Sequence, residues 1–306
     1  MASYDYVTVN VFTGDRFGGN PLAVFPKAEG LTDDQMQAIA REFNLSETTF
    51  VLPPDDPSHT ARVRIFTPAH EMPFAGHPNV GTGFVLARAM DKPPEHLTFE
   101  EVAGLVRVHI LRDANREITG TRISAPRSLS IGDAVPTETV AACASLTPKD
   151  ILTNGHHPLK ASVGVEFVIA EVASLEALAR AMPDIAAFRA AGAQSGNAIA
   201  GGNLRFALLL YVRRDGDATK LRARMFAPLG GVLEDPATGS ACATLAALLT
   251  SMAPGENVSL HYEIEQGVEM GRPSLLIASG RKTAEGPVEA TVGGGCVPSM
   301  SGRLEL

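Results

Sequence analysis

A short stretch of the chain occurs twice, and this repeat constrains the fold more than any other feature. Arg62-Val63-Arg64-Ile65-Phe66-Thr67-Pro68 corresponds to Arg222-Ala223-Arg224-Met225-Phe226-Ala227-Pro228, 160 residues later. In both copies a polar loop containing proline follows, and then an apolar run long enough for a helix. Aligning Pro78 with Pro236 reduces the offset to 158 and implies a deletion of two residues. A repeated unit of strand, loop and helix predicts two similar domains related by a pseudo-twofold axis, with matching loops that face one cleft.

The order of the predicted elements indicates an α+β fold. Apolar and polar residues alternate over 6–12, as in a half-buried strand, and Thr32 with Gln35 forms a capping box for a helix that ends near Asn44. Because strands and helices follow one another without regular βαβ spacing, we expect mostly antiparallel sheets. The other expected strands are 21–25, 46–52, 61–66, 98–99, 106–111, 121–124, 162–172 and 206–212, and the other expected helices are 80–90, 137–144, 175–182, 185–191 and 241–252.

The chain length agrees with two domains. At roughly 150 residues per domain, 306 residues correspond to about two domains. We place an N-terminal domain at 1–124 and a C-terminal domain at 125–306, with the C-terminal strand 291–306 as an element that could pack on the first domain. Hydrophobic residues make up 45% of the chain, enough for each domain to have its own core.

Charge and cysteine content limit the kinds of partner. The chain has 26 Lys and Arg against 34 Asp and Glu, and this net charge of −8 argues against a nucleic-acid or acidic-membrane binder and favours a small-molecule partner. Cys143, Cys242 and Cys296 are odd in number and widely spaced, so we expect neither a disulfide framework nor a zinc site. Without an apolar run of about 18 residues or a secretory leader pattern, we expect a cytoplasmic protein that does not insert into membranes.

Each copy of the repeat places a short polar motif before its apolar helix. Ala75-Gly76-His77-Pro78 stands at one helix start, and Glu234-Asp235-Pro236 followed by Ala237-Thr238-Gly239-Ser240 stands at the other. The N–H groups and the positive dipole end of a helix start favour a carboxylate or a developing enolate. Two facing helix starts would form a strong anion-binding site. The alternative is that Asn79 and Asp235 are ordinary capping residues.

Glu47 is the candidate proton-transfer residue. Strand alternation places it on the same face as Leu45, Thr49 and Val51. A carboxylate among apolar neighbours loses hydration, which makes it a better proton acceptor and donor near neutral pH. An ion pair with Arg62 or Arg64 on the neighbouring strand explains the local pattern equally well.

Three other features are candidates for chemistry. His77 stands between Gly76 and Pro78 at a helix start, which favours a functional role over a structural one. His156-His157 has the composition of a metal-binding pair, but adjacent residues on a strand point to opposite faces and no third ligand is nearby, so no metal is expected. Cys242 lies inside the apolar helix and is expected to be a buried thiol rather than a nucleophile.

Dinucleotide, NTP, zincin and serine-hydrolase motifs are absent from the sequence, so no cofactor is predicted.

Several longer motifs stand in a fixed order along the chain. They are Phe17-Gly18-Gly19-Asn20-Pro21-Leu22-Ala23-Val24, Asn44-Leu45-Ser46-Glu47-Thr48, Phe66-Thr67-Pro68, Ala75-Gly76-His77-Pro78, Glu234-Asp235-Pro236-Ala237-Thr238-Gly239-Ser240-Ala241, Ile264-Glu265-Gln266-Gly267-Val268-Glu269-Met270-Gly271-Arg272-Pro273 and Val292-Gly293-Gly294-Gly295. Together they resemble the phenazine-biosynthesis isomerase family of the PhzF type over nearly the whole chain. The resemblance implies a diaminopimelate-epimerase-like fold of two pseudo-symmetric domains, each with a mostly antiparallel sheet wrapped around a central helix. It also implies an active site between the domains and, commonly, a homodimer.

The resemblance assigns roles to individual positions. The proton-transferring glutamate of the family corresponds to Glu47, the helix-start histidine to His77 and the motif aspartate to Asp235. Asn79 stands where many members have threonine, which bears on the substrate more than on the chemistry. The anion-binding positions of the family correspond to Gly76, Gly239 and Ser240. The polar residue next to the family's glutamate, also a substrate-binding position, corresponds to Ser46.

The leading hypothesis is a cofactor-independent isomerase that moves a proton between carbons of a small carboxylate-bearing substrate. Related racemases use a cysteine at each helix start, whereas this chain has Ala75 with Gly76 and Thr238 with Gly239, which argues against a two-thiol racemase. The alternatives are an epimerase of an amino acid derivative and a non-catalytic member that binds a small molecule or a protein. Dihydrohydroxyanthranilate is one candidate substrate.

Overall fold

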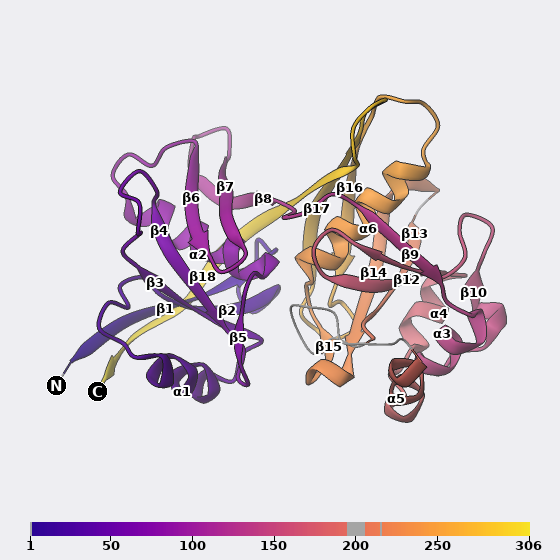
Figure 1. Cartoon of the computed structure of the whole chain (residues 1–306), viewed down its shortest axis with the longest axis horizontal. Coiled ribbons are helices and arrows are strands. Elements are labelled where there is room, and N and C mark those ends of the chain that lie inside the picture. Colours follow the sequence, from indigo (N-terminus) through magenta and orange to yellow (C-terminus); the bar gives the residue numbers. More distant parts are fainter. Residues whose placement is uncertain (1, 195–205, 215) are drawn as a thin grey trace. The chain divides into compact units, whose positions relative to one another are not determined.

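The computed structural model describes residues 2–194, 206–214 and 216–306. These residues form two units, one made of 1–124 with 292–306 and the other of 125–291 (Figure 1). Each unit combines a sheet with a few helices, which confirms the predicted α+β class. Among the described residues, no helix has both the length and the apolar character that crossing a membrane requires.

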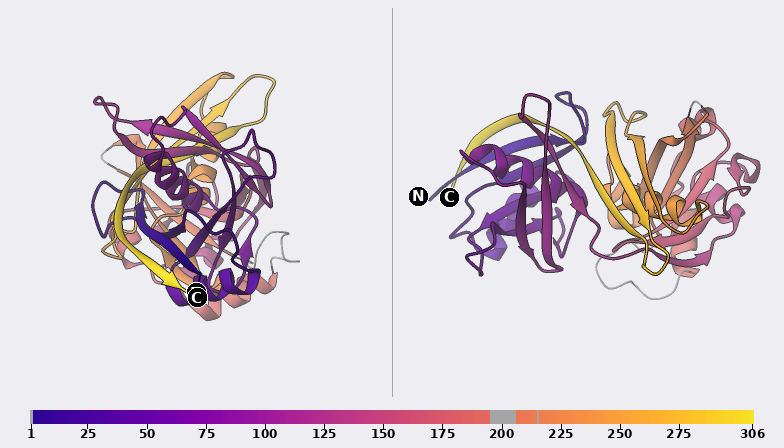
Figure 2. Two further views of the ribbon diagram at one scale, coloured as in Figure 1. Left: turned by 90° about the vertical axis from the view of Figure 1, so that its left-hand side faces the viewer. Right: turned by 90° about the horizontal axis from the view of Figure 1, so that it is seen from above.

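The first unit is a sheet that closes around helix α2 (Gly76–Ala89). Its strands are β1 (Ser3–Val11), β2 (Asn20–Phe25), β3 (Glu47–Leu52), β4 (Ala61–Phe66), β5 (Glu71–Met72), β6 (His96–Glu101), β7 (Gly104–Arg112), β8 (Ile118–Ser124) and most of β18 (Glu289–Glu305). Most neighbours are antiparallel, but β2 with β3 and β4 with β6 are parallel. Strand β18 pairs with both β1 and β8 and so joins the two ends of the sheet. Figure 2 (left) shows α2 surrounded by these strands.

Small and polar residues allow α2 to lie inside the curved sheet. A Cβ atom at Gly81 would lie only 2.6 Å from the Leu22 side chain and 2.8 Å from that of Val11, so glycine is needed for this close approach. At the next residue of the helix, the hydroxyl groups of Thr82 and Thr49 are 2.8 Å apart. These contacts fix α2 against strands β1, β2 and β3.

The opposite face of the same sheet packs against helix α1 (Asp33–Phe43). The predicted capping box of Thr32 and Gln35 begins this helix, and Asn44, with φ at 50°, ends it. The two faces of β3 therefore contact different helices, so strand alternation decides which residues face α2. The core on the α1 side consists of Phe25, Ala28, Leu31, Met36, Ile39, Ala40, Phe50, Leu52 and Phe66.

The second unit repeats this architecture around helix α6 (Gly239–Met252). Its strands β12 (Glu166–Val172), β13 (Leu208–Arg214), β14 (Asp217–Ala227), β16 (Val258–Gln266) and β17 (Ser274–Lys282) pair in the same parallel and antiparallel order as β2, β3, β4, β6 and β7, which confirms the predicted repeat. Its other elements are the helices α3 (Thr137–Cys143), α4 (Leu175–Arg180) and α5 (Ile185–Gln194) and two short 3-10 helices, Pro148–Asp150 and Pro228–Gly230. Its strands are β9 (Ser130–Ala134), β10 (Ile151–Leu152), β11 (Leu159–Ser162), β12 (Glu166–Val172), β13 (Leu208–Arg214), β14 (Asp217–Ala227), β15 (Val232–Asp235), β16 (Val258–Gln266) and β17 (Ser274–Lys282).

The structure corrects the alignment of the two copies. Helices α2 and α6 begin at Gly76 and Gly239, which are 163 positions apart. Since the preceding strands are 160 apart, the second copy carries three additional residues, and the predicted two-residue deletion is wrong. Pro236 therefore corresponds to Pro73 rather than to Pro78, and it precedes its helix instead of lying in the first turn.

Most of the predicted elements are present, and the differences have physical causes. The strand expected over 162–172 is two strands, β11 and β12, because a turn at Gly164, with φ at 147°, separates them. The antiparallel pair β16 and β17 was not predicted, although apolar and polar residues alternate through 258–266. Strand β18 begins at Glu289, two residues before the predicted segment, and pairs with β1.

Candidate active site

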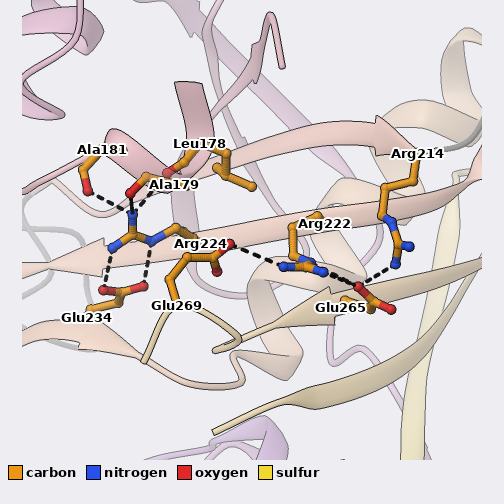
Figure 3. Close-up of polar contacts among 9 residues, drawn as sticks. All are labelled: Leu178, Ala179, Ala181, Arg214, Arg222, Arg224, Glu234, Glu265 and Glu269. Carbon is orange, nitrogen blue, oxygen red and sulfur yellow. Dashed lines mark hydrogen bonds and ion pairs between the residues drawn. The ribbon is translucent and has the colours of Figure 1, made fainter. Parts of the chain in front are cut away.

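In both units an arginine–glutamate pair holds the hairpin that precedes the helix start. Arg224 in β14 donates from Nε and Nη2 to the carboxylate of Glu234 in β15, each over 2.8 Å, and from Nη1 to carbonyl groups at the end of α4 (Figure 3). Arg64 in β4 makes the same two-bond contact with Glu71 in β5, each over 2.7 Å. Each guanidinium also lies over the phenylalanine ring two residues later in its strand. Equivalent contacts therefore anchor the loops that lead into α2 and α6.

A second arginine of the repeat fixes the loop that follows β16. Arg222 donates to Glu265 over 2.9 Å and to Glu269 over 3.2 Å, and Arg214 also contacts Glu265 (Figure 3). Burial alone would raise the pKa of Glu265, but the hydrogen bonds from both guanidinium groups hold it below its ordinary value. The loop next to Gln266 is therefore held by charge-assisted hydrogen bonds.

Neither helix start is capped by the side chain of its N-cap residue. The N-cap of α2 is Ala75, and the hydroxyl of Thr238, the N-cap of α6, makes no capping bond. Asn79 lies inside α2, where its Nδ2 donates to the Ala75 carbonyl over 3.0 Å, and Asp235 precedes the N-cap. Neither Asn79 nor Asp235 is therefore the N-cap residue of its helix. The first N–H groups of both helices keep the positive end of the dipole that suits an anion.

In the first unit the structure brings Glu47 and His77 together. Glu47 begins β3, His77 is the second residue of α2, and the distance from Glu47 Oε2 to His77 Nε2 is 3.5 Å. The side chain of His77 is 6% exposed and that of Glu47 is 16% exposed. A carboxylate at the edge of a buried site keeps some access to solvent while its neighbours exclude most water.

Asn20 determines which nitrogen of His77 carries the proton. The Asn20 Nδ2 atom lies 3.4 Å from His77 Nδ1, so the amide donates and Nδ1 accepts. Burial lowers the pKa of His77 to about 3, so the ring is neutral at physiological pH. The single ring proton therefore resides on Nε2, which lies 3.5 Å from Glu47 Oε2 but is not aligned for a hydrogen bond to that atom.

The strand register excludes the alternative role for Glu47. Arg64 is opposite Phe50, and Arg62 is opposite Leu52, so both arginines share the face of β3 that packs on α1. Glu47 is on the other face. Arg64 instead binds Asp33 and Glu71, and Arg62 contacts Asp55.

In the second unit, Asp235 belongs to a hydrogen-bonded loop at the start of α6. Its carboxylate accepts from Thr238 Oγ1 over 2.5 Å, and its carbonyl accepts from Gln266 Nε2 over 2.7 Å. Gln266 Oε1 in turn accepts from the Thr238 N–H over 3.1 Å. This network holds the Asp235 carboxylate beside the first turn of α6, which begins with the buried Gly239.

The remaining candidates surround these groups. Ser46 is partly buried and directly precedes Glu47, and Gly76 is buried at the first position of α2. Ser240 is the partly buried second residue of α6, which is the position that His77 occupies in α2. Cys242 is buried, and desolvation together with the Asp235 charge raises the pKa of its thiol, as expected for a core thiol.

The histidine pair 156–157 makes contacts within its own unit. His156 Nε2 is 2.9 Å from the Tyr211 hydroxyl, and its Nδ1 donates to the His157 carbonyl over 2.7 Å. Tyr211 donates to Glu171 over 2.9 Å. Both ring nitrogens of His156 are thus occupied by protein groups. The described residues contain no cluster of three potential metal ligands.

Comparison with known proteins assigns the fold first and then the family. A PhzF-family phenazine biosynthesis protein of Bacillus anthracis superposes with a TM-score of 0.86 at 24% identity, over 100% of both chains, and shares this two-unit, epimerase-like fold. The model of the phenazine biosynthesis-like family, PhzC-PhzF, matches residues 9–302. The chain belongs to this family of isomerases.

Two curated relatives extend over nearly the full length. An uncharacterized isomerase of Mesorhizobium japonicum is 40% identical and covers 99% of each chain. The trans-2,3-dihydro-3-hydroxyanthranilate isomerase of Pseudomonas fluorescens is 35% identical and covers 99% of this chain and 100% of its own. Both names agree with the expected class of enzyme.

Sequence reasoning missed three residues that shape the two sites. Asn20, Thr238 and Gln266 all lie within the ordered sequence motifs, but the sequence predicted no role for them. Their roles depend on hydrogen bonds to residues 57 and 28 positions away, between Asn20 and His77 and between Gln266 and Thr238. Local spacing could not have revealed these contacts, although a polar residue at the end of an alternating strand was visible at Gln266.

Proposed function

We propose that the protein is a cofactor-independent isomerase in which Glu47 moves a proton between two carbon atoms of a small carboxylate-bearing substrate. The observation that carries this proposal is the contact between Glu47 and a buried, neutral His77. An enclosed carboxylate that still reaches the edge of its site can accept a proton from carbon and return it. The neutral imidazole does not neutralise this base, because a histidine with so low a pKa carries no positive charge.

In the proposed reaction, the Glu47 carboxylate removes a proton from one carbon, and the electron pair left behind spreads over the conjugated substrate. The same carboxyl group then protonates a different carbon, so enzyme and substrate regain their charges. The N-terminal ends of α2 and α6 would hold the substrate carboxylate or the delocalised anion. Their first residues, Gly76 and Gly239, have no side chain that would block access to the backbone N–H groups. His77 lies beside this carboxylate, with its Nε2 atom 3.5 Å from Glu47 Oε2.

We assign substrate orientation to the second unit. The Asp235 carboxylate, held by Thr238, suits a hydroxyl or ammonium group of the substrate, and Ser240 and Ser46 supply further hydrogen bonds. This proposal requires that groups from both units act on one substrate molecule. The units correspond to the predicted domains 1–124 and 125–306, except that residues 292–306 belong to the first unit. We further propose a cytoplasmic homodimer, in keeping with the family resemblance.

Two alternative functions remain distinct from this proposal. An epimerase of an amino acid derivative would invert one carbon and need a second base, but the helix starts carry Gly76 and Gly239 rather than a pair of thiols. A non-catalytic binding protein would not need a base held against a neutral histidine. The geometry at Glu47 favours the isomerase.

The proposal is tested by offering trans-2,3-dihydro-3-hydroxyanthranilate and a panel of small unsaturated carboxylates to the protein in D₂O. Proton NMR should show isomerised product, or deuterium at carbon, for at least one compound. Sedimentation of the same sample tests the dimer. A compound that raises the melting temperature but never exchanges hydrogen at carbon would instead support the binding-protein alternative.

A further inference from the structure

A second buried carboxyl group lies in the first unit and has no part in the proposed reaction. Glu101 is the last residue of β6, and both of its carboxyl oxygens are shielded from solvent without a hydrogen bond of ordinary geometry in the described part of the chain. Burial raises the pKa of Glu101 to about 8, and the nearby Asn79 amide offsets part of this rise. At pH 7 the side chain is therefore mainly a neutral acid, which can donate as well as accept a hydrogen bond.

The repeat gives Glu101 a counterpart in the second unit. Gln266 is the last residue of β16 and pairs with Ala223, which corresponds to Val63. The pairing of β4 with β6 ends with Arg62 opposite Glu100, so Glu101 is the next residue, beside Val63. Glu101 and Gln266 thus occupy equivalent positions, and each follows alternate buried residues that face the central helix.

One contact of these two residues is also equivalent. Cys242 in α6 corresponds to Asn79 in α2 by the spacing of 163 that relates the helices. The Cys242 thiol lies 3.5 Å from Gln266 Oε1, and Asn79 lies beside the Glu101 carboxyl. Each strand end therefore meets the fourth residue of its helix.

The function of Gln266 is visible in its hydrogen bonds. It joins the Asp235 carbonyl to the Thr238 N–H and so fixes the loop and the N-cap of α6. In the first unit, Asn79 fixes the N-cap by donating to the Ala75 carbonyl over 3.0 Å. Glu101, at the end of β6, lies beside the same asparagine side chain. A neutral carboxylic acid has nearly the shape and the hydrogen-bonding capacity of the glutamine amide that serves the same place in the other copy.

We propose that Glu101 is a positioning residue that supports, through Asn79, the first turn of α2 on which Gly76 and His77 lie. The inference rests on the proposed function, because it assigns that turn to the proton-transfer site. It adds a residue that the family motifs did not single out. A side chain that holds a reacting group in place affects catalysis because small displacements of that group are costly.

The test compares Glu101→Gln with Glu101→Ala. In turnover of the substrate found for the wild type, Glu101→Ala should lower kcat by about tenfold to a hundredfold with a smaller change in KM, and Glu101→Gln should restore most of that loss. Asn79→Ala should reproduce the Glu101→Ala loss, and the double variant should lose no more than either alone, because the two residues act through one contact. Glu95→Gln, an exposed position near the start of the same strand, is the matched control.

A second measurement requires no substrate and separates this inference from the proposed function. The ¹⁵N signals of the His77 ring, assigned by their loss in His77→Gln, should be unchanged in Glu101→Gln and shifted in Glu101→Ala. Melting temperatures confirm that each variant is folded. Equal kcat values and equal His77 signals in Glu101→Ala and the wild type would overturn the inference. Equal losses in Glu101→Gln and Glu101→Ala would also overturn it, since the carboxyl itself would then be required. If Glu47→Gln stays active, the proposed function fails, but the His77 signals still test Glu101.

Discussion

The two helix starts are built alike but supplied with different chemistry. Both hairpins are held by an arginine–glutamate fork, and both central helices begin with glycine. In the first unit a carboxylate approaches the helix start from the sheet, at Glu47, whereas in the second the carboxylate of Asp235 belongs to the loop itself. The two units therefore share the supports of the helix start and differ in where the carboxylate is placed. This difference supports our proposal that Glu47 moves the proton and that Asp235 orients the substrate.

The largest expected effect comes from exchanging the two carboxylates for amides. Glu47→Gln should lower kcat by ~10²- to 10⁴-fold, as removal of a general base does. Asp235→Asn should act mainly on KM, because we assign it to orientation. Steady-state kinetics with the substrate of the wild type measure both. If Asp235→Asn lowers kcat as strongly as Glu47→Gln, both copies supply proton-transfer groups and the contrast between them is wrong.

The two forks provide the next comparison. Arg224 is only 8% exposed and binds the Glu234 carboxylate and three carbonyl groups, so Arg224→Met leaves a buried charge and should cost about 3–5 kcal/mol of the free energy of unfolding. Arg64 is 19% exposed, and its partner Asp33 is largely in solvent, so Arg64→Met should cost about 1–2 kcal/mol. Urea unfolding measures both. Equal losses would mean that burial does not distinguish the two supports.

A pH dependence distinguishes Glu101 from its counterpart Gln266. Because the folded pKa of Glu101, about 8, exceeds the ordinary value of 4.5, the folded state binds a proton that the unfolded state releases between these values. Stability from this group is complete below pH 4.5 and is lost as the pH rises to 8. Glu101→Gln should remove this loss, and the gain at pH 8.5 relative to pH 5 should be on the order of 3 kcal/mol. A variant with the same pH profile as the wild type would show that Glu101 is already ionised at pH 7.

The smallest effect is expected at Cys242, which corresponds to Asn79 in the other helix. Its raised thiol pKa and complete burial make it a neutral core residue. Cys242→Ala should cost about 1–2 kcal/mol of stability, and kcat should stay within about twofold of the wild type. Thermal unfolding and kinetics check this expectation. Complete loss of activity in a folded Cys242→Ala protein would restore the thiol-based racemase alternative.

The sequence predicted much of the fold because the repeat and the local signals agreed. The capping box at Thr32 and the apolar helices had periodic patterns that local structure follows directly. Strand β18 contains Gly293, Gly294 and Gly295, which have low strand propensity, and pairing with β1 and β8 determines it instead. The three-residue difference between the copies was missed because both loops contain a proline, and Pro78 was aligned with Pro236. Only the positions at which α2 and α6 begin give the correct alignment.

Prediction of the site depended on the family resemblance more than on local pattern. Strand alternation placed Glu47 on the correct face, but it could not choose between a base and an ion pair with Arg62 or Arg64. The register of β3 with β4 removes the ion pair, and the contact with His77 crosses 30 residues of chain. Such contacts arise from packing around α2, which no window of sequence contains.

Hydrogen exchange at substrate carbon in Glu47→Gln tests the central claim most directly. Wild-type protein and the variant are each mixed in excess with substrate in D₂O, and deuterium at carbon is followed by NMR alongside the melting temperature. We predict that the wild type incorporates deuterium, that Glu47→Gln incorporates none, and that the two melting temperatures are nearly equal. A destabilised variant that still exchanges hydrogen at carbon would contradict the account and would assign Glu47 to structure.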